Sequence, residues 1–276
     1  MRRCFKGIVL VMVLLAVGGY FCYRDFQSFC QETVPILAYH RVDDLSDRYT
    51  ILPETFDKQM AYLAQEGYTT LTLDNYAAAR RAGNAFHKTV VVIVDDGYRD
   101  NLTKAAPIMK KYGFVGSMYM AVKFEGWPGY LDWQGEEELL KYGWEIGSHT
   151  FSHVPLTTLS QEQVRSELEK SSAYIRGLYN PPSGITLSFP TGATNALIEK
   201  EVAAAKYSAA VSGDVGVNTA TTPLLHLNRV NIFQYKQMQS LKLFRAALLK
   251  AQLRSWSLSH GVDLIGWWDK LRGNAK

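Results

Sequence analysis

An apolar run that ends in two carboxylates limits what this chain can fold into more than any other segment. The segment VVVIVDDGY covers residues 90 to 98, and its first five residues are all β-branched. Such a run predicts a strand buried on both faces, as in a parallel sheet. The strand would bring Asp95 and Asp96 to its C-terminal end, where parallel α/β proteins build their sites. An isolated DDG more often marks a solvated turn, but the five apolar residues before it favour a site.

Two histidines follow about fifty residues later. The segment GSHTFSH, residues 147 to 153, places His149 and His153 four positions apart. In a helical turn both imidazoles would point the same way and could bind one ion. With one aspartate, the set offers two nitrogens and one oxygen, which suits zinc or a similar divalent metal and leaves a position open for water. A surface pair is the alternative, but the strand-like residues 144 to 147 before it favour a metal site.

The length and composition indicate one large α/β domain. The chain has 276 residues, of which 47% are hydrophobic, which is enough for a proper core and excludes general disorder. Its net charge of +4 is too weak to indicate nucleic-acid binding, but it fits an envelope protein near anionic polymer or lipid. The cysteines, Cys4, Cys22 and Cys30, all lie near the N-terminus, so we expect no cysteine metal site in the domain that follows.

Strand-like and helix-like segments alternate after residue 35, and this order predicts a (β/α) barrel. The expected strands are residues 35–40, 69–73, 90–94, 115–121, 185–189 and 207–211. The expected helices are residues 53–66, 74–81, 102–112, 136–142, 160–179 and 195–205. Ser160 is expected to cap its helix, with Gln163 three residues on.

The two ends of the chain differ from this pattern. In residues 1 to 30, a basic cluster (Arg2, Arg3 and Lys6) precedes an uncharged stretch from 7 to 23. This predicts a membrane anchor whose basic end stays in the cytoplasm, with a cleaved signal peptide as the alternative. Either way, the domain of residues 31 to 233 would lie outside the cytoplasm. Residues 234 to 276 predict a basic helical tail that packs on the domain or contacts a membrane surface.

Four segments together resemble one enzyme family. VDDGY and SHTFSH are similar to the aspartate and histidine motifs of the NodB-homology polysaccharide deacetylases, carbohydrate esterase family four. VPILAYHRV (34–42) resembles the N-terminal strand of the extracellular poly-N-acetylglucosamine deacetylases, and SFPTGATN (188–195) resembles their proline–glycine loop. The resemblance covers roughly residues 34 to 232 and implies a distorted, incomplete (β/α) barrel.

The resemblance also implies roles for single residues. Asp96, His149 and His153 would hold a divalent metal, which we expect to be zinc, with cobalt or nickel as alternatives. Asp95 would be the general base that takes a proton from water. The general acid would be His40; His226 is the alternative acid, and otherwise would contact the substrate or serve a structural role.

Substrate binding is expected at two further places. In the proline–glycine loop, formed by Pro190, Thr191 and Gly192, the backbone N–H of Thr191 is the candidate for binding the oxyanion. The arginine that is usual near the start of this loop is absent, because Ser188 stands there, so Arg229 or Arg99 would have to orient Asp95. In EGWPGYLDW (125–133), the aromatic residues could stack on sugar rings or only fill the barrel rim. They are Trp127, Tyr130 and Trp133.

The expected function is therefore metal-dependent de-N-acetylation of an extracellular N-acetylglucosamine polysaccharide, with poly-β-1,6-N-acetylglucosamine of a biofilm matrix as the expected polymer. A peptidoglycan N-deacetylase and a glycan O-deacetylase are alternatives within the same chemistry. A catalytically silent carbohydrate-binding protein is an alternative of another class, and the missing arginine is the feature that favours it.

Overall fold

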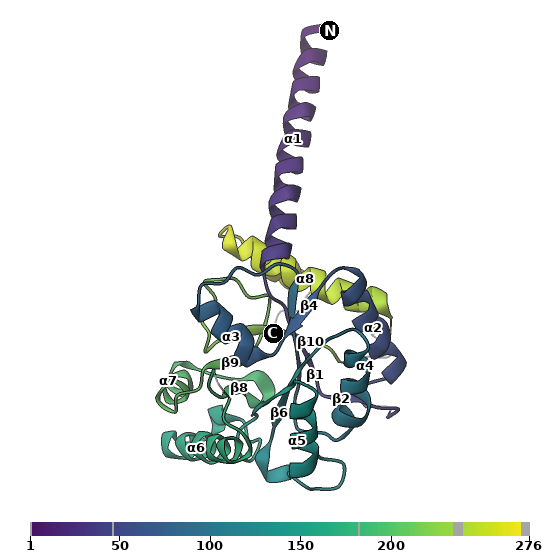
Figure 1. The fold of residues 1–276 in the computed structure, drawn as a ribbon. Coiled ribbons are helices and arrows are strands. Elements are labelled where there is room, and N and C mark those ends of the chain that lie inside the picture. Colours follow the sequence, from purple (N-terminus) through teal and green to yellow (C-terminus); the bar gives the residue numbers. More distant parts are fainter. Residues whose placement is uncertain (1, 46, 182, 234–239, 272–276) are drawn as a thin grey trace.

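A computed structural model describes residues 2–45, 47–181, 183–233 and 240–271, and within them seven parallel strands close into a barrel (Figure 1). The (β/α) barrel predicted from the sequence is thus confirmed, but the ring is closed by the pairing of β1 with β5, whereas the resemblance implied an incomplete barrel. In order around the ring the strands are β1 (Ile36–Tyr39), β10 (Leu227–Asn231), β9 (Ala209–Val215), β8 (Thr186–Ser188), β7 (Glu145–Ser148), β6 (Ser117–Met120) and β5 (Thr89–Val94).

Two short additions distort the barrel. Strand β4 (Thr69–Leu71) pairs with the first half of β5, whereas β6 pairs with its last two residues. Strands β2 (Arg41–Val42) and β3 (Thr50–Ile51) form a separate parallel pair directly after β1. The register of β5 against three different strands explains why the ring is irregular at this point.

The continuous apolar run of β5 reflects burial on both faces. Val90, Val92 and Val94 pack in the cluster that contains the outer helices, whereas Val91 and Ile93 pack in the barrel interior. Because side chains alternate along a strand, Asp95 continues the inward-facing series. The run therefore delivers one carboxylate into the mouth of the barrel.

Helices surround the ring, and most lie where the sequence predicts them (Figure 1). They are α2 (Pro53–Gln65), α3 (Leu73–Arg81), α4 (Ala106–Lys110), α5 (Trp133–Lys141), α6 (Gln161–Leu178) and α7 (Ala196–Ala204). The capping box of Ser160 and Gln163 at the start of α6 is confirmed. The helix expected over residues 102–112 is instead a π-helical turn, Asn101–Ala105, followed by α4. Pro107, which has no N–H to donate, lies in the first turn of α4, where the helix needs no such donor.

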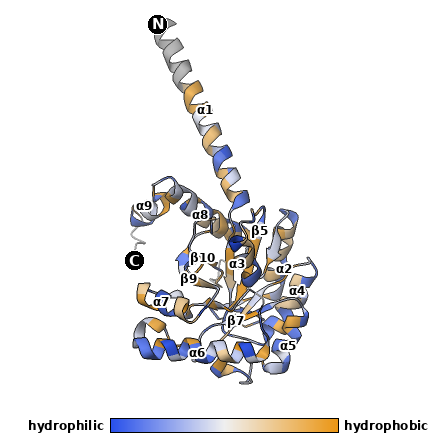
Figure 2. Cartoon of the chain, turned by 60° about the vertical axis from the view of Figure 1, so that its left-hand side comes forward, coloured by the Kyte–Doolittle hydropathy of each residue, from blue (hydrophilic) through white to orange (hydrophobic). Residues whose placement is uncertain are grey.

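The N-terminal and C-terminal helices meet at the end of the barrel where β1 begins. Helix α1 (Arg2–Glu32) projects away from the barrel. Helix α8 (Leu241–Ser259) lies across the end of the barrel from which α1 projects, at the top in Figure 1, and is followed by α9 (Leu264–Leu271) (Figures 1 and 2). Phe244 and Leu248 of α8 are buried against the barrel, and Trp256 donates to Asp25 of α1 at 2.7 Å. In the described part of the chain, no helix combines the length and the apolar character needed to cross a membrane. The first residues of the expected tail, 234 to 239, lie outside the described residues.

Glu136→Gln is expected to raise the free energy of unfolding at neutral and alkaline pH. Glu136 is buried in α5, and burial raises its pKa to about 8, although the Tyr174 hydroxyl lies 2.9 Å from one of its oxygens. The unfolded chain ionises at the usual value of 4.5, so the wild type loses stability as pH rises from there to about 8. Glutamine cannot ionise, and we expect a gain of about 1–3 kcal/mol at pH 8 that vanishes below pH 4.

Urea unfolding at several pH values measures this difference. Glu138→Gln is the matched control, because Glu138 is exposed on the same helix. A gain for Glu136→Gln that is equally large at every pH would show that ionisation is not its cause.

Candidate active site

Asp95 and Asp96 follow β5 at a sharp turn. The backbone takes a left-handed conformation at Asp96 (φ 74°) and again at Gly97 (φ 90°). The left-handed φ is the reason for glycine at position 97, because a Cβ there would meet only the flexible end of the Met120 side chain, 2.8 Å from its sulfur. Asp95 is almost fully buried, at 1% exposure. The turn thus points the carboxylates of Asp95 and Asp96 in different directions.

Asp96 meets both predicted histidines. Its Oδ1 atom lies 3.4 Å from His149 Nε2 and 3.1 Å from His153 Nε2. One ligand atom from each of the three residues lies within 4.8 Å of the others, and Asp96 Oδ1 is buried with no hydrogen-bond partner. Burial alone would raise the pKa of Asp96, but the two imidazoles lower it well below its usual value. Two imidazole nitrogens and one ionised carboxylate fit a divalent metal such as zinc.

The histidine loop is not a helical turn, and that part of the prediction was wrong. His149 directly follows β7, and Thr150 (φ 65°) and His153 (φ 62°) are both left-handed, so the chain coils back on itself without helical hydrogen bonds. Left-handed conformations at non-glycine residues are costly and cluster at functional sites. The spacing of four still places both rings together, because this coiled loop replaces the helical turn.

One contact fixes the His149 ring, and two hydrogen bonds fix the loop between the histidines. His149 Nδ1 lies 2.6 Å from the Ser188 carbonyl oxygen, which can only accept, so Nδ1 donates and Nε2 is left for a metal. Between the two histidines, the Ser152 N–H and hydroxyl both donate to Glu167 of α6, each at 2.8 Å. The sequence contained no clear signal for Glu167, and it singled out Ser188 only as the residue in the place of the usual arginine, because a helix-surface glutamate and a backbone carbonyl carry no motif.

Arg229, rather than Arg99, makes the contact with Asp95 that the missing arginine left open. Its Nη1 atom lies 3.0 Å from Asp95 Oδ2, and both side chains are buried. Arg229 lies on β10, on the same inward-facing series as Leu227. The other possible substitute, Arg99, pairs with Asp132 at 2.7 Å. Asp95 Oδ1 is buried and has no hydrogen-bond partner, so one oxygen of the carboxylate remains free to accept a proton.

His40 directly follows β1, where the Tyr39 carbonyl accepts from the Asp95 N–H at 3.0 Å, and its surroundings differ from those of His226. Burial lowers the pKa of His40, while Asp95 and Asp96 act on it in the opposite direction, as expected of a histidine close to both carboxylates. The ring packs 5.0 Å from that of Tyr49, and Nδ1 is buried without a partner.

His226 has both ring nitrogens engaged elsewhere. Nδ1 lies 2.7 Å from Glu199, and Nε2 lies 2.8 Å from Asp214. Neither nitrogen remains to contact a substrate at Asp95, so the geometry supports His40 as the acid.

Asn101 holds His40 and was not singled out from the sequence. Its side-chain amide, fully buried, donates to the His40 carbonyl at 2.8 Å. The neighbouring Asp100 accepts from the Val42 N–H at 3.0 Å and from Arg41 Nε at 2.8 Å. These contacts join the segment after β1 to the segment after β5. In the sequence, Asp100 and Asn101 resemble the polar residues that ordinarily begin a helix.

The proline–glycine loop packs against Arg229. Pro190 is buried and Thr191 is exposed with φ 60°. A Cβ on Gly192 would overlap Gly213 and lie 2.9 Å from Arg229 Nη2, so only glycine fits here. The Gly192 N–H donates to the Phe189 carbonyl at 2.8 Å and is thus unavailable to an oxyanion. The Thr191 N–H therefore remains the candidate for donating a hydrogen bond to the oxyanion.

The aromatic residues of the 125–133 segment divide into two groups. Tyr130 stacks on Tyr98 at 4.8 Å, and Trp127 packs 5.0 Å from Phe124, whose ring is 6.4 Å from that of His153. Trp127 is 49% exposed. Trp133 lies apart from them: its ring packs edge-on against Tyr174 at 5.9 Å, and its N–H donates to Glu137. Trp127, rather than Trp133, therefore offers an exposed ring in the group that reaches His153 through Phe124.

Trp127→Ala is expected to raise KM for a polysaccharide about tenfold and to leave kcat almost unchanged, because an exposed ring contributes stacking but no chemistry. Trp133→Ala removes an equal ring from the other group and is the control. Steady-state kinetics on one oligosaccharide series measures both variants. A larger KM increase for Trp133→Ala would show that Trp133, and not Trp127, stacks on the sugar.

Known proteins share this sequence pattern and fold. A sequence model of the polysaccharide deacetylase family matches residues 82–210. YxkH of Bacillus subtilis (strain 168), a polysaccharide deacetylase by its assigned name, is 28% identical over 200 residues, which are 72% of this chain and 71% of that protein.

Two solved structures illustrate the likeness in fold. The Streptococcus pyogenes deacetylase PplD in complex with acetate has a TM-score of 0.71 at 24% identity, and the match covers 80% of this chain and 99% of that one. IcaB from Ammonifex degensii has a TM-score of 0.66 at 21% identity, covering 80% and 97%.

Proposed function

We propose that this chain de-N-acetylates an extracellular N-acetylglucosamine polysaccharide. Residues 82–210 match the model of the polysaccharide deacetylase family, whose members are hydrolases acting on carbon–nitrogen bonds. The expected polymer is poly-β-1,6-N-acetylglucosamine. The observation that carries the proposal is the arrangement at the barrel mouth. A buried Asp95–Arg229 pair lies beside a cluster of three metal-ligand side chains, and His40 lies close to both.

The residues suit amide hydrolysis in separate roles. A divalent metal held by Asp96, His149 and His153 would lower the pKa of bound water to about 7 and polarise the acetyl carbonyl. Arg229 orients Asp95 through Oδ2, so that Oδ1 can accept the proton from the attacking water.

His40 completes the reaction on the leaving group. Departure of the sugar amine requires a proton, and His40 would donate it. Asn101 positions this histidine through its backbone carbonyl, so its part is indirect. The Thr191 N–H would bind the oxyanion, and Arg229 stands in for the usual arginine, which weakens the argument for a catalytically silent protein.

The choice of polymer has its own support. Residues 34–42 resemble the N-terminal strand of extracellular poly-N-acetylglucosamine deacetylases, and His40 of that segment is the histidine that lies at the cluster. The exposed ring of Trp127 suits stacking on a sugar but does not distinguish linkages.

Acetate release by the full chain in a mild detergent, after chelation and return of zinc, cobalt or nickel, tests the proposal. The substrates are β-1,6-linked and β-1,4-linked N-acetylglucosamine oligomers, peptidoglycan glycan strands and an O-acetylated glycan. We expect metal-dependent release that is fastest from the β-1,6-linked oligomers. Faster release from glycan strands would make the protein a peptidoglycan deacetylase, and binding without release from any substrate would make it a binding protein.

We also propose that the enzyme acts at the outer face of the cytoplasmic membrane, attached through its N-terminal segment. The basic cluster before the uncharged residues 7 to 23 supports this orientation. Protease treatment of intact cells and of membrane fractions tests it. Recovery of the enzyme in the medium, shortened at its N-terminus, would indicate a cleaved signal peptide instead.

A further inference from the structure

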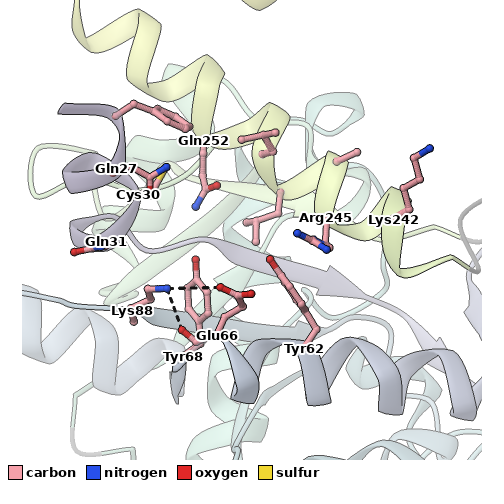
Figure 3. Close-up of a pocket in the computed structure, with 14 residues that line it drawn as sticks. Gln27, Cys30, Gln31, Tyr62, Glu66, Tyr68, Lys88, Lys242, Arg245 and Gln252 are labelled. Carbon is pink, nitrogen blue, oxygen red and sulfur yellow. Dashed lines mark hydrogen bonds and ion pairs between the residues drawn. The ribbon is translucent and has the colours of Figure 1, made fainter. Parts of the chain in front are cut away.

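A cavity of about 470 Å³ lies at the end of the barrel opposite to the candidate active site (Figure 3). Lys88, which lines it, directly precedes β5, whereas Asp95 directly follows that strand. A strand of this length separates the two sites by roughly 20 Å. The cavity lies between the last turns of α1, the end of α2 and the first half of α8. The cavity therefore does not contact the candidate catalytic residues.

The cavity is lined by more cations than carboxylates. Lys88, Lys242 and Arg245 line it together with one carboxylate, Glu66. Lys88 donates to the Glu66 carbonyl at 3.0 Å and lies 4.0 Å from its carboxylate, so these two charges largely offset each other. Lys242 and Arg245 carry the excess positive charge. A cavity of this composition favours an anion.

Aromatic rings and amides complete the lining. The Arg245 guanidinium lies 5.2 Å over the ring of Tyr62, and Lys88 lies 5.3 Å from the ring of Tyr68 (Figure 3). Gln252, only 6% exposed, adds a buried amide. The rings hold the cations at the cavity wall. The Gln252 amide already donates one N–H to the Tyr68 hydroxyl, and its second N–H is the one offered to an oxygen-rich group.

The helix that lines the cavity continues into an apolar surface. Phe26 and Cys30 of α1 face the cavity, and the preceding turns of the same helix project away from the barrel (Figure 2). A helix that exposes apolar side chains around its circumference needs apolar surroundings. Only one helical turn separates this surface from the cavity. The exposed apolar residues are Met12, Val13, Leu14, Leu15, Val17, Tyr20, Phe21 and Tyr23.

A cationic cavity at the C-terminal end of an apolar helix suits one kind of ligand, an amphiphile with an anionic head. We propose that this cavity binds the phosphate of an anionic phospholipid headgroup, while the acyl chains lie along the apolar part of α1. Arg245 and Lys242 pair with the phosphate, and Gln252 contacts the polar part of the headgroup. The proposal does not rest on the deacetylase activity.

Cys30 provides a reporter inside the cavity. In the full chain with Cys4→Ser and Cys22→Ser, Cys30 is the single remaining thiol. Burial raises the pKa of Cys30 to about 12, so its alkylation is slow, and a ligand that covers the thiol should slow it further. The rate of alkylation is measured in nonionic detergent at mildly alkaline pH. We expect short-chain phosphatidylglycerol to slow it about fivefold, because ligand at several times its Kd leaves few sites free.

Two double variants on α8 localise the effect. Lys242→Gln with Arg245→Gln should raise the phosphatidylglycerol concentration needed for half of this protection about 30-fold, as expected for the loss of two cations beside a phosphate. The control, Lys250→Gln with Arg254→Gln, removes the same charge from the same helix but leaves the cavity unchanged, so protection should persist. Acetate release should be unaffected in both, which separates this result from the fate of the proposed function.

Several results would overturn the assignment. Equal slowing by short-chain phosphatidylcholine would exclude a site for anionic lipids. Equal slowing by glycerol 3-phosphate would assign the cavity to a soluble phosphate, and slowing by N-acetylglucosamine oligomers would assign it to the polymer. Full protection in the Lys242 and Arg245 double variant would show that the lipid binds elsewhere.

Discussion

Asp95→Asn is expected to lower kcat about 10²–10⁴-fold, the usual contribution of a general base, without changing the metal content. The substitution keeps the size and the hydrogen-bonding oxygen of the side chain but removes the group that accepts a proton. Because the metal ligands belong to Asp96, His149 and His153, zinc should still bind. Single-turnover acetate release and the metal content of the purified variant measure the two effects separately.

Stability is the main complication of this experiment. The neutral amide in Asp95→Asn would leave the buried Arg229 without its charged partner, at a cost of about 3–5 kcal/mol. The double variant Asp95→Asn with Arg229→Gln removes both charges and should melt closer to the wild type while remaining inactive. Asp57→Asn, in an exterior ion pair with Lys111, is the control for the chemistry of the substitution. An active, metal-loaded double variant would exclude Asp95 as the base.

His153→Gln is expected to lower the affinity for zinc by at least about 100-fold and to abolish turnover at low zinc concentration, because even outer partners of metal ligands contribute 10–100-fold. His153 suits this test better than His149, because it is partly exposed, at 31% of its side chain, and its replacement threatens the fold less. Competition with a chromophoric chelator measures the affinity without reference to activity.

The matched control is His87→Gln, an exposed histidine on the loop before β5. Its zinc affinity and turnover should equal those of the wild type. Excess zinc should partly restore turnover in His153→Gln, because it refills the weakened site although one ligand is missing. Unchanged zinc affinity in this variant would remove His153 from the ligand set, whatever its turnover.

Much of the fold could be predicted because its signals are local. Burial on both faces of β5 required an unbroken run of β-branched residues, and the Ser160–Gln163 capping box lies within the first turn of a single helix. The site motifs were visible for a similar reason, since Asp96 and His149 each lie just after a strand of a parallel barrel. The conformation of the histidine loop was missed, because a spacing of four does not distinguish a helical turn from a loop with left-handed residues.

By itself, the sequence determined the strand ends that carry charge, the residue types offered to a metal, and the family that the motifs resemble. Only the tertiary structure decided which distant partners complete the site. Arg229 lies 134 positions from Asp95 and was no better a candidate than Arg99 until the closure of the barrel placed β10 beside β1. The same closure left His40 at the cluster and gave both nitrogens of His226 to Glu199 and Asp214. The physical reason is that local patterns record burial and backbone geometry, whereas ion pairs between strands depend on strand order and register, which no short segment contains.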